Sequence, residues 1–143
     1  MSKFFQKKVR LPKFRAGYHL ITDLIENEFL EIKEIRTGFL HVFIQHTSAA
    51  LTINENADPT VRRDFQTFVN DLIPETYSKF IHTYEGPDDM PAHIKASFFD
   101  SSLQIPITSG QLALGIWQGI YLCEFRTHAS QRNLILTAYG ELA

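Results

Sequence analysis

The clearest helical pattern of apolar positions lies in the middle of the chain. Five apolar residues recur at intervals of three and four, the spacing of one helix face: Val61, Phe65, Phe68, Val69 and Leu72. Asp58 and Pro59 precede them, and this pair is typical of a helix start. The aspartate can accept from free N–H groups of the first turn, and proline at the first position loses no bond. The pattern predicts a helix over residues 59–72.

Two further helices are predicted from weaker signals. Asp23 followed by Glu26 has the spacing of a capping box, and apolar residues at positions 25, 29 and 32 share one face. These features predict a helix over residues 23–35. Farther along, the acidic pair before Met90 can cap a shorter helix over residues 90–99.

The remaining apolar runs are short and bounded by turn residues, which indicates strands. The predicted strands cover residues 4–11, 17–21, 39–46, 103–107, 111–116, 120–127 and 133–139. We expect residues 111–116 and 120–127 to form a hairpin around Gln118 and Gly119. The fold class predicted is mainly β with helices (α+β), and the apolar stripe of residues 59–72 should pack on a sheet face.

Composition narrows the class of protein. A chain of 143 residues suits one domain, and 44% hydrophobic with 21% charged residues indicates a folded protein. The net charge of −2 gives no electrostatic reason to expect a nucleic acid or an anionic membrane as partner. Cys123 is the only cysteine, so no internal disulfide can form. No apolar stretch approaches the roughly 18 residues of a membrane span, and no signal peptide is recognisable, so a cytoplasmic location is expected.

Three histidines lie where a site could be built. His46 ends a predicted strand, His93 lies just inside a capped helix and His128 follows a hairpin strand. Three neutral imidazoles brought together would suit Zn²⁺ or a similar divalent ion with one open coordination position. A divalent metal ion, Zn²⁺ or Mg²⁺, is the cofactor expected. The histidine spacings of 47 and 35 residues match no compact ligand motif. The other histidines are interpreted as structural: His19, His41 and His82.

Polar residues near these histidines complete the candidate site. Glu124, Arg126 and His128 face the same side of a predicted strand, as expected either at a solvated surface or in a polar site. We predict catalytic roles for His46, His93, Glu124 and Asp89. Hydrogen bonds or charge for a substrate or anion are expected from Ser48, Asn54, Lys95 and Arg126. The chain has no glycine-rich phosphate loop, no G-x-S-x-G elbow and no H-E-x-x-H motif.

Three long motifs closely resemble the YjbQ family. They are HTSAALTINENADP at residues 46–59, YEGPDDMPAHIK at 84–95 and LGIWQGIYLCEFR at 114–126. The resemblance runs from about Phe5 to Leu142. Two positions depart from the family pattern: Ile116 stands where threonine is usual, and Phe125 where histidine is common.

The resemblance implies a compact jelly-roll-like β-sandwich with helices packed on it, assembled as a homotrimer. It also implies a secondary thiamine-phosphate synthase activity, which joins a pyrimidine diphosphate to a thiazole phosphate. Charge on the leaving diphosphate would then be neutralised by a divalent metal, or by Arg126 and Lys95. The same residues suit a metal-dependent hydrolase of a phosphorylated metabolite equally well. A non-catalytic module that binds a metal or a metabolite is the third alternative.

Overall fold

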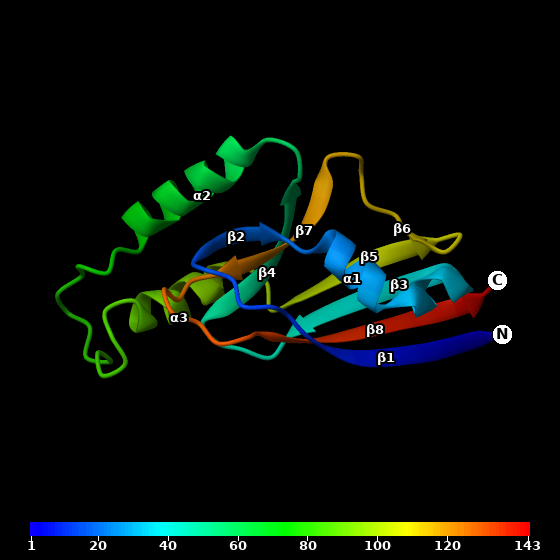
Figure 1. Ribbon diagram of the computed structural model, residues 1–143, viewed down its shortest axis with the longest axis horizontal. Helices are drawn as coiled ribbons and strands as arrows, with labels where there is room; N and C mark the ends of the chain where they lie inside the picture. The colour runs from blue at the N-terminus through cyan, green and yellow to red at the C-terminus, as the bar shows by residue number, and fades with distance from the viewer.

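Eight strands form two antiparallel sheets in the structure, a computed structural model that describes residues 1–143 (Figure 1). The larger sheet has the order β1-β8-β3-β5-β6, and the smaller has the order β2-β7-β4. The strands are β1 (Ser2–Arg10), β2 (Gly17–Leu20), β3 (Ile35–Ile44), β4 (Ala49–Glu55), β5 (Ser102–Thr108), β6 (Gln111–Leu112), β7 (Gln118–Glu124) and β8 (Asn133–Leu142). The predicted α+β class, mainly β, is confirmed.

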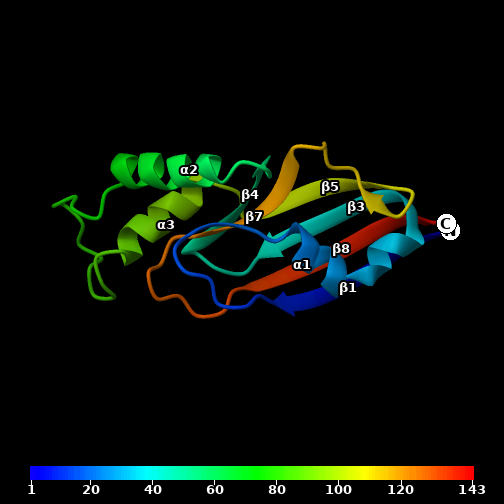
Figure 2. The same cartoon turned by 45° about the horizontal axis from the view of Figure 1, so that its top comes forward.

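Three α-helices accompany the sheets: α1 (Thr22–Glu28), α2 (Pro59–Leu72) and α3 (Asp89–Phe98). The bounds of α2 match the prediction, and Asp58 Oδ1 accepts from the Thr60 N–H at 2.9 Å as a capping residue should. The third helix begins and ends one residue earlier than predicted. Figure 2 shows α2 and α3 together at the end of the molecule that carries the smaller sheet.

The predicted helix over residues 23–35 is wrong in its second half. α1 ends at Glu28, and a 3₁₀ helix, η1 (Leu30–Glu34), follows it. Phe29 separates the two with a non-helical φ of −129°, and its side chain is fully buried in the core. The expected capping box does not form, because Ile21 is the N-cap residue and makes no side-chain bond. The helical spacing of apolar residues therefore continues through this segment, although the α-helix itself is interrupted there.

The predicted hairpin between residues 111–116 and 120–127 is also wrong. β6 is only two residues long and pairs with β5, whereas β7 pairs with β2 on one side and β4 on the other. All residues of β7 after Gln118 are buried, which is typical of a central strand. The motif at residues 46–59 contains strand β4 (Ala49–Glu55), so its central part is paired in the smaller sheet.

Two groups of buried side chains hold the fold together. The larger contains 20 residues, chiefly the inward faces of β3, β5 and β8 with Ile25 and Phe29. The smaller lies at the end covered by α2 and α3, and consists of Tyr18, Ala50, Ala92, Tyr121, Cys123 and Phe125. Burial, with a contribution from the charge of Asp100, raises the pKa of the Cys123 thiol far above its usual range.

α2 covers the smaller sheet only in part. None of its residues is fully buried, although Phe65 packs against the smaller core group. Phe68 and Leu72 are 68% and 60% exposed, so two of the five residues of the apolar stripe face away from the protein. The expected packing of this stripe on a sheet face is thus incomplete within one chain. None of the helices is long and apolar enough to span a membrane.

Candidate metal centre and adjoining pockets

One group of potential metal ligands exists in the structure, and it consists of His82, Asp89 and His93. Asp89 is the first residue of α3, His93 lies one turn later, and His82 comes from the segment before the helix. Asp89 Oδ2 is 2.9 Å from His82 Nε2 and 3.2 Å from His93 Nε2. The carboxylate is 2% exposed, whereas both imidazoles remain accessible.

The orientation of His93 leaves two acceptors face to face. His93 Nδ1 lies 2.9 Å from the main-chain oxygen of Thr47. Because a carbonyl oxygen only accepts, Nδ1 must carry the proton, and in the neutral ring Nε2 presents its lone pair to Asp89 Oδ2. Two lone pairs at 3.2 Å repel one another unless a proton or a metal cation lies near them. Metal-binding histidines commonly donate their second N–H to a main-chain carbonyl in this way.

A second set of bonds fixes the other oxygen of Asp89. Arg126 Nη1 donates to Asp89 Oδ1 at 2.6 Å, and Arg126 Nε donates to Asp88 Oδ2 at 3.0 Å. Burial opposes charge on Asp88, but bonds from the Thr127 N–H and Arg126 outweigh it and lower the Asp88 pKa. Burial likewise opposes charge on Arg126, and the neighbouring carboxylates outweigh it and raise the Arg126 pKa. The carboxylate of Asp89 is thus held with Oδ2 directed toward the two imidazoles.

The donor set fits a divalent transition metal better than magnesium. The three ligand atoms lie within 4.8 Å of one another. Ligands about 2.0–2.1 Å from a tetrahedral Zn²⁺ are themselves about 3.3 Å apart, so small movements of two exposed imidazoles would suffice. Two nitrogens and one oxygen suit Zn²⁺ or a similar ion, whereas Mg²⁺ prefers oxygen ligands.

A buried ion pair lies on the other side of the Thr47 segment. Arg132 donates to both oxygens of Glu124, through Nε at 2.7 Å and through a shorter contact from Nη2. Nη2 also donates to Ser48 Oγ at 2.9 Å. Glu124 and Arg132 are 1% and 6% exposed. The predicted site residues Glu124 and Ser48 are therefore both bonded to Arg132.

His46 belongs to this buried network rather than to the metal ligands. The Asn133 N–H donates to its Nε2 at 2.8 Å, so the neutral ring carries its proton on Nδ1, 3.4 Å from Arg132 Nη1. Burial first, and the Arg132 charge second, lower the pKa of His46. His128 is exposed and forms no hydrogen bond. The predicted ligand set of His46, His93 and His128 is thus not assembled within one chain, and His82 takes its place beside His93.

His93 and His46 nevertheless share an open pocket of about 550 Å³. Hydroxyl residues and Phe99 make up half of its lining; the members are His46, Thr47, Ala49, His93, Ala96, Ser97, Phe99 and Ser101. No arginine or lysine lines it. The predicted anion-binding residue Asn54 lies elsewhere on β4, where its side chain accepts from the Glu55 N–H.

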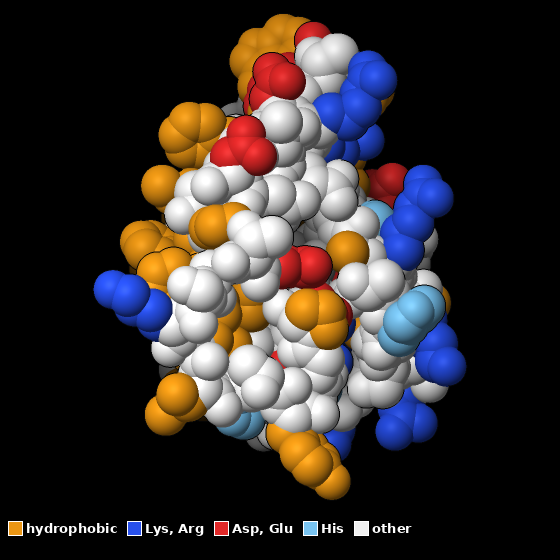
Figure 3. Space-filling view, turned by 90° about the vertical axis from the view of Figure 1, so that its left-hand side faces the viewer, with side chains coloured by type: hydrophobic (Ala, Val, Ile, Leu, Met, Phe, Trp, Pro, Cys, Tyr) orange, Lys and Arg blue, Asp and Glu red, His pale blue; other side chains and the backbone are white.

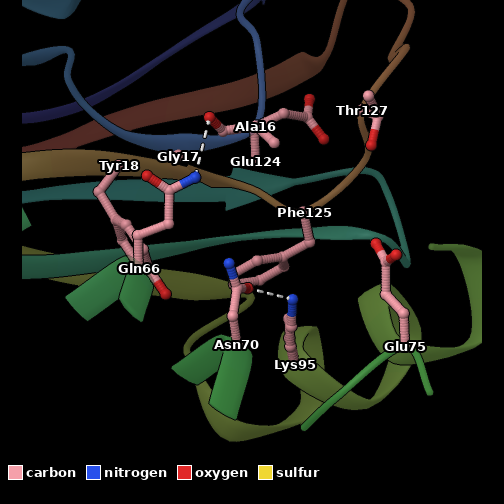
Figure 4. A pocket seen from close by; sticks show the side chains of 10 residues that line it. All are labelled: Ala16, Gly17, Tyr18, Gln66, Asn70, Glu75, Lys95, Glu124, Phe125 and Thr127. Carbon is pink, nitrogen blue, oxygen red and sulfur yellow. Dashed lines mark hydrogen bonds between the residues drawn. The ribbon is translucent and has the colours of Figure 1, made fainter. Parts of the chain in front are cut away.

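Lys95 faces a different pocket, because residues two apart on a helix point to nearly opposite sides. Its nitrogen donates to Asn70 Oδ1 at 2.6 Å and lies 5.9 Å from the centre of the Phe125 ring (Figure 4). The pocket has a volume of about 210 Å³ and lies between α2, α3 and the ends of β2 and β7. Burial lowers the pKa of Lys95, and Glu75 and Asp88 partly oppose this effect.

The structure therefore divides the predicted site into three parts. Asp89, Arg126 and His93 belong to the candidate metal centre; Glu124, Ser48 and His46 belong to the buried network; Lys95 lines its own pocket. Sequence reasoning missed His82 and Arg132. Both precede regular elements in irregular segments, where side-chain direction cannot be inferred from periodicity.

The matched protein family is described as UPF0047 protein YjbQ-like, and its model covers residues 7–141. The chain belongs to this family. The YjbQ protein of Escherichia coli O157:H7 is 44% identical over 138 residues, which is 96% of this chain and 99% of that protein. A UPF0047 protein of Synechocystis is 46% identical over 108 residues, 76% of this chain and 74% of that protein.

Solved structures of UPF0047/YjbQ-like proteins share the fold. A YbjQ-like protein of unknown function from Sulfolobus solfataricus matches with a TM-score of 0.86 at 25% identity, covering 99% of this chain and 100% of that one. An uncharacterised family member from Clostridium acetobutylicum matches with a TM-score of 0.75 at 36% identity, covering 92% and 97%. The resemblance read from the three motifs is therefore confirmed, and the function of the family is not established by these relatives.

Proposed function

We propose that the chain is a metal-dependent enzyme that acts on a phosphorylated small molecule, with thiamine-phosphate synthase-like chemistry as its first candidate reaction. The observation that carries this proposal is the His93 arrangement. Thr47 fixes the proton on Nδ1, so the lone pair of Nε2 meets Oδ2 of Asp89, a carboxylate whose other oxygen Arg126 already holds in place. This combination of ligand and supporting bonds is typical of a cation site.

His82, Asp89 and His93 would hold the ion. A bound divalent cation would supply charge neutralisation for a leaving diphosphate and polarise a phosphoryl oxygen. The protein itself offers little cationic charge for this task, since Arg126 and Arg132 are both engaged with carboxylates. The pocket beside His93 provides hydroxyl groups from Thr47, Ser97 and Ser101 to orient a polar substrate.

Metal binding by variants tests the proposal first. Wild-type protein purified without chelator and titrated with Zn²⁺ should bind one ion per chain, as measured by elemental analysis and calorimetry. His82→Ala and His93→Ala should each weaken binding by roughly 10–100-fold or more. His128→Ala is the matched control, because this histidine is exposed and forms no bond, and it should bind as wild type does. Unchanged binding by His93→Ala would refute the metal centre.

Turnover decides between the two enzyme reactions. Wild type and His128→Ala should form thiamine phosphate from the pyrimidine diphosphate and thiazole phosphate, and His93→Ala should not. If wild type makes no thiamine phosphate above background, release of inorganic phosphate from phosphorylated metabolites is the next assay. Metal binding without either activity would favour the non-catalytic binding module.

We also propose that the chain self-associates as a homotrimer. The exposed part of the α2 stripe adjoins an apolar groove of about 530 Å³ between α2 and α3. Its lining residues are Leu72, Ile73, Pro74, Tyr77, Phe80, Ile94 and Phe98. Figure 3 shows this end of the molecule, where hydrophobic side chains project at the surface. An apolar surface of this kind on a folded chain is typical of an interface.

A further inference from the structure

Lys95 differs from every other buried charged residue of the chain. Asp89, Glu124 and Arg132 each have an oppositely charged partner within bonding distance. Lys95 is 7% exposed, yet no ion pair joins it to a carboxylate. A buried ammonium without a carboxylate at bonding distance is costly, so such a group is rarely kept for packing alone.

The nitrogen of Lys95 has capacity left for a ligand. An ammonium group has three N–H donors, and the Asn70 side chain accepts from one of them. The pocket of about 210 Å³ in front of it has aromatic walls from Tyr18 and Phe125 and a hydroxyl from Thr127. This volume exceeds the roughly 30 Å³ share of a single water molecule several times over. The pocket can therefore hold a small organic molecule that places an anionic group on Lys95.

The two carboxylates that line the pocket differ in whether a cationic side chain already pairs with them. Glu124 is already neutralised by its two bonds to Arg132. Glu75 is exposed at the mouth of the pocket and takes part in no ion pair. In Figure 4 its carboxylate stands apart from the Lys95 nitrogen, on a separate segment of the chain. The pocket thus has a positive charge at its inner wall and a negative charge at its rim.

We infer that this pocket binds a small zwitterion of the amino-acid class, with the carboxylate on Lys95 and the ammonium group toward Glu75. A dianionic phosphate fits less well, because Glu75 would repel its second charge. The site is separate from the metal centre, since Lys95 and His93 face different pockets on either side of α3. Its occupancy therefore does not depend on the proposed enzyme reaction.

Binding of a matched probe series tests this inference. Glycine, β-alanine and γ-aminobutyrate increase the distance between the two charges stepwise, and acetate, propionate and butyrate lack the ammonium group. Calorimetry or NMR titration of the full chain should show at least one amino acid binding about tenfold more tightly than its matched carboxylate. Inorganic phosphate should bind more weakly than that amino acid.

Two variants test which residue binds each charged group of the ligand. Lys95→Met should abolish binding of both the amino acid and the carboxylate, whereas Glu75→Gln should remove only the preference for the amino acid. Lys33→Met, at an exposed lysine far from the pocket, is the control and should bind as wild type does. Glu75→Gln alters an exposed side chain, so it decides the matter even if Lys95→Met does not fold. Equal affinity for amino acids, carboxylates and phosphate, or no binding of any probe, would overturn the inference.

Discussion

The Glu124–Arg132 pair is the most deeply buried charge interaction of the chain. Its members come from the end of β7 and from the segment before β8, so it joins the two sheets. Removing one partner of a buried pair leaves the other charge uncompensated in a medium of low dielectric constant. Each member of this pair is therefore expected to contribute to stability, whatever its position near a functional site.

We predict that Glu124→Gln lowers the free energy of unfolding by about 3–5 kcal/mol, because Arg132 stays buried without a full counter-charge. Urea denaturation followed by circular dichroism measures this change. The matched control is Glu141→Gln, which breaks the exposed pair with Arg36 at 2.6 Å and should cost at most about 1 kcal/mol. Equal losses in the two variants would contradict this assignment.

His46 makes stability depend on pH in a defined direction. Its pKa in the folded protein is lowered from the ordinary value of about 6.5, so the unfolded chain binds this proton more readily. The contribution of His46 is therefore complete above pH about 6.5 and is lost as the pH falls through the folded-state pKa. Denaturation between pH 8 and 5 should show a smaller decline for His46→Gln than for wild type. An identical decline would mean that other groups cause it.

For individual residues, the sequence predicted the place of a side chain on its helix or strand better than it predicted the residues to which that side chain bonds. His93 and Asp89 were identified because the acidic pair predicts a helix start there; the two side chains do lie together, although Asp88 makes no side-chain capping bond. His82 was interpreted as structural because a single histidine is more often a local hydrogen-bonding residue than a metal ligand. Arg132 carries no motif at all, and only the fold brings it to Glu124 and His46.

At the scale of elements, two glycines allow β3 and β8 to lie close together. Gly38 is paired with Gly140, and a Cβ on either one would collide with the main chain of the opposite strand. Gly140 also has a φ of +154°, which side chains of L-residues rarely permit. The approach of these strands therefore depends on glycine at both positions.

Gly140→Ala should lower the free energy of unfolding by about 4–5 kcal/mol or more, as expected for a backbone clash that cannot relax. Gly115→Ala serves as the control, because a Cβ there would meet only the flexible side chain of Gln118. We expect a change of about 1 kcal/mol or less for this control. Thermal or urea unfolding of the two variants provides the comparison, and similar values would show that the strands can separate at little cost.

Elements were predicted well where the capping signal forms a real hydrogen bond in the structure. For α2, the capping residues and the apolar period both indicated the same bounds. For residues 23–35, the capping-box spacing and the apolar period both indicated a helix, but no side-chain cap forms and the α-helix ends before Phe29. The strand pairing of β7 could not be predicted from the sequence, because its partners β2 and β4 lie about 70–100 residues away. Apolar segments closer in the sequence were equally plausible as pairing partners.

At the scale of the whole molecule, the exposed apolar stripe of α2 predicts assembly. Phe68→Glu should shift the mass measured by light scattering at micromolar concentration from a trimer toward a monomer, because it places a charge in the proposed interface. Thr67→Glu is the control, since this neighbouring residue is also exposed but outside the apolar stripe. A monomeric wild type, or a Phe68→Glu variant that stays trimeric, would contradict the proposed interface.

The burial of Cys123 has a practical consequence for measuring how copies of the chain assemble. The chain has no other thiol, and this one lies within the core with a strongly raised pKa, so alkylating reagents should leave the native protein unlabelled. A cysteine introduced in place of the exposed Ile81 would then be the single reactive position of each chain. A spin label or fluorophore attached there would report distances between copies without first removing the natural cysteine. Three equal distances would reveal threefold symmetry directly.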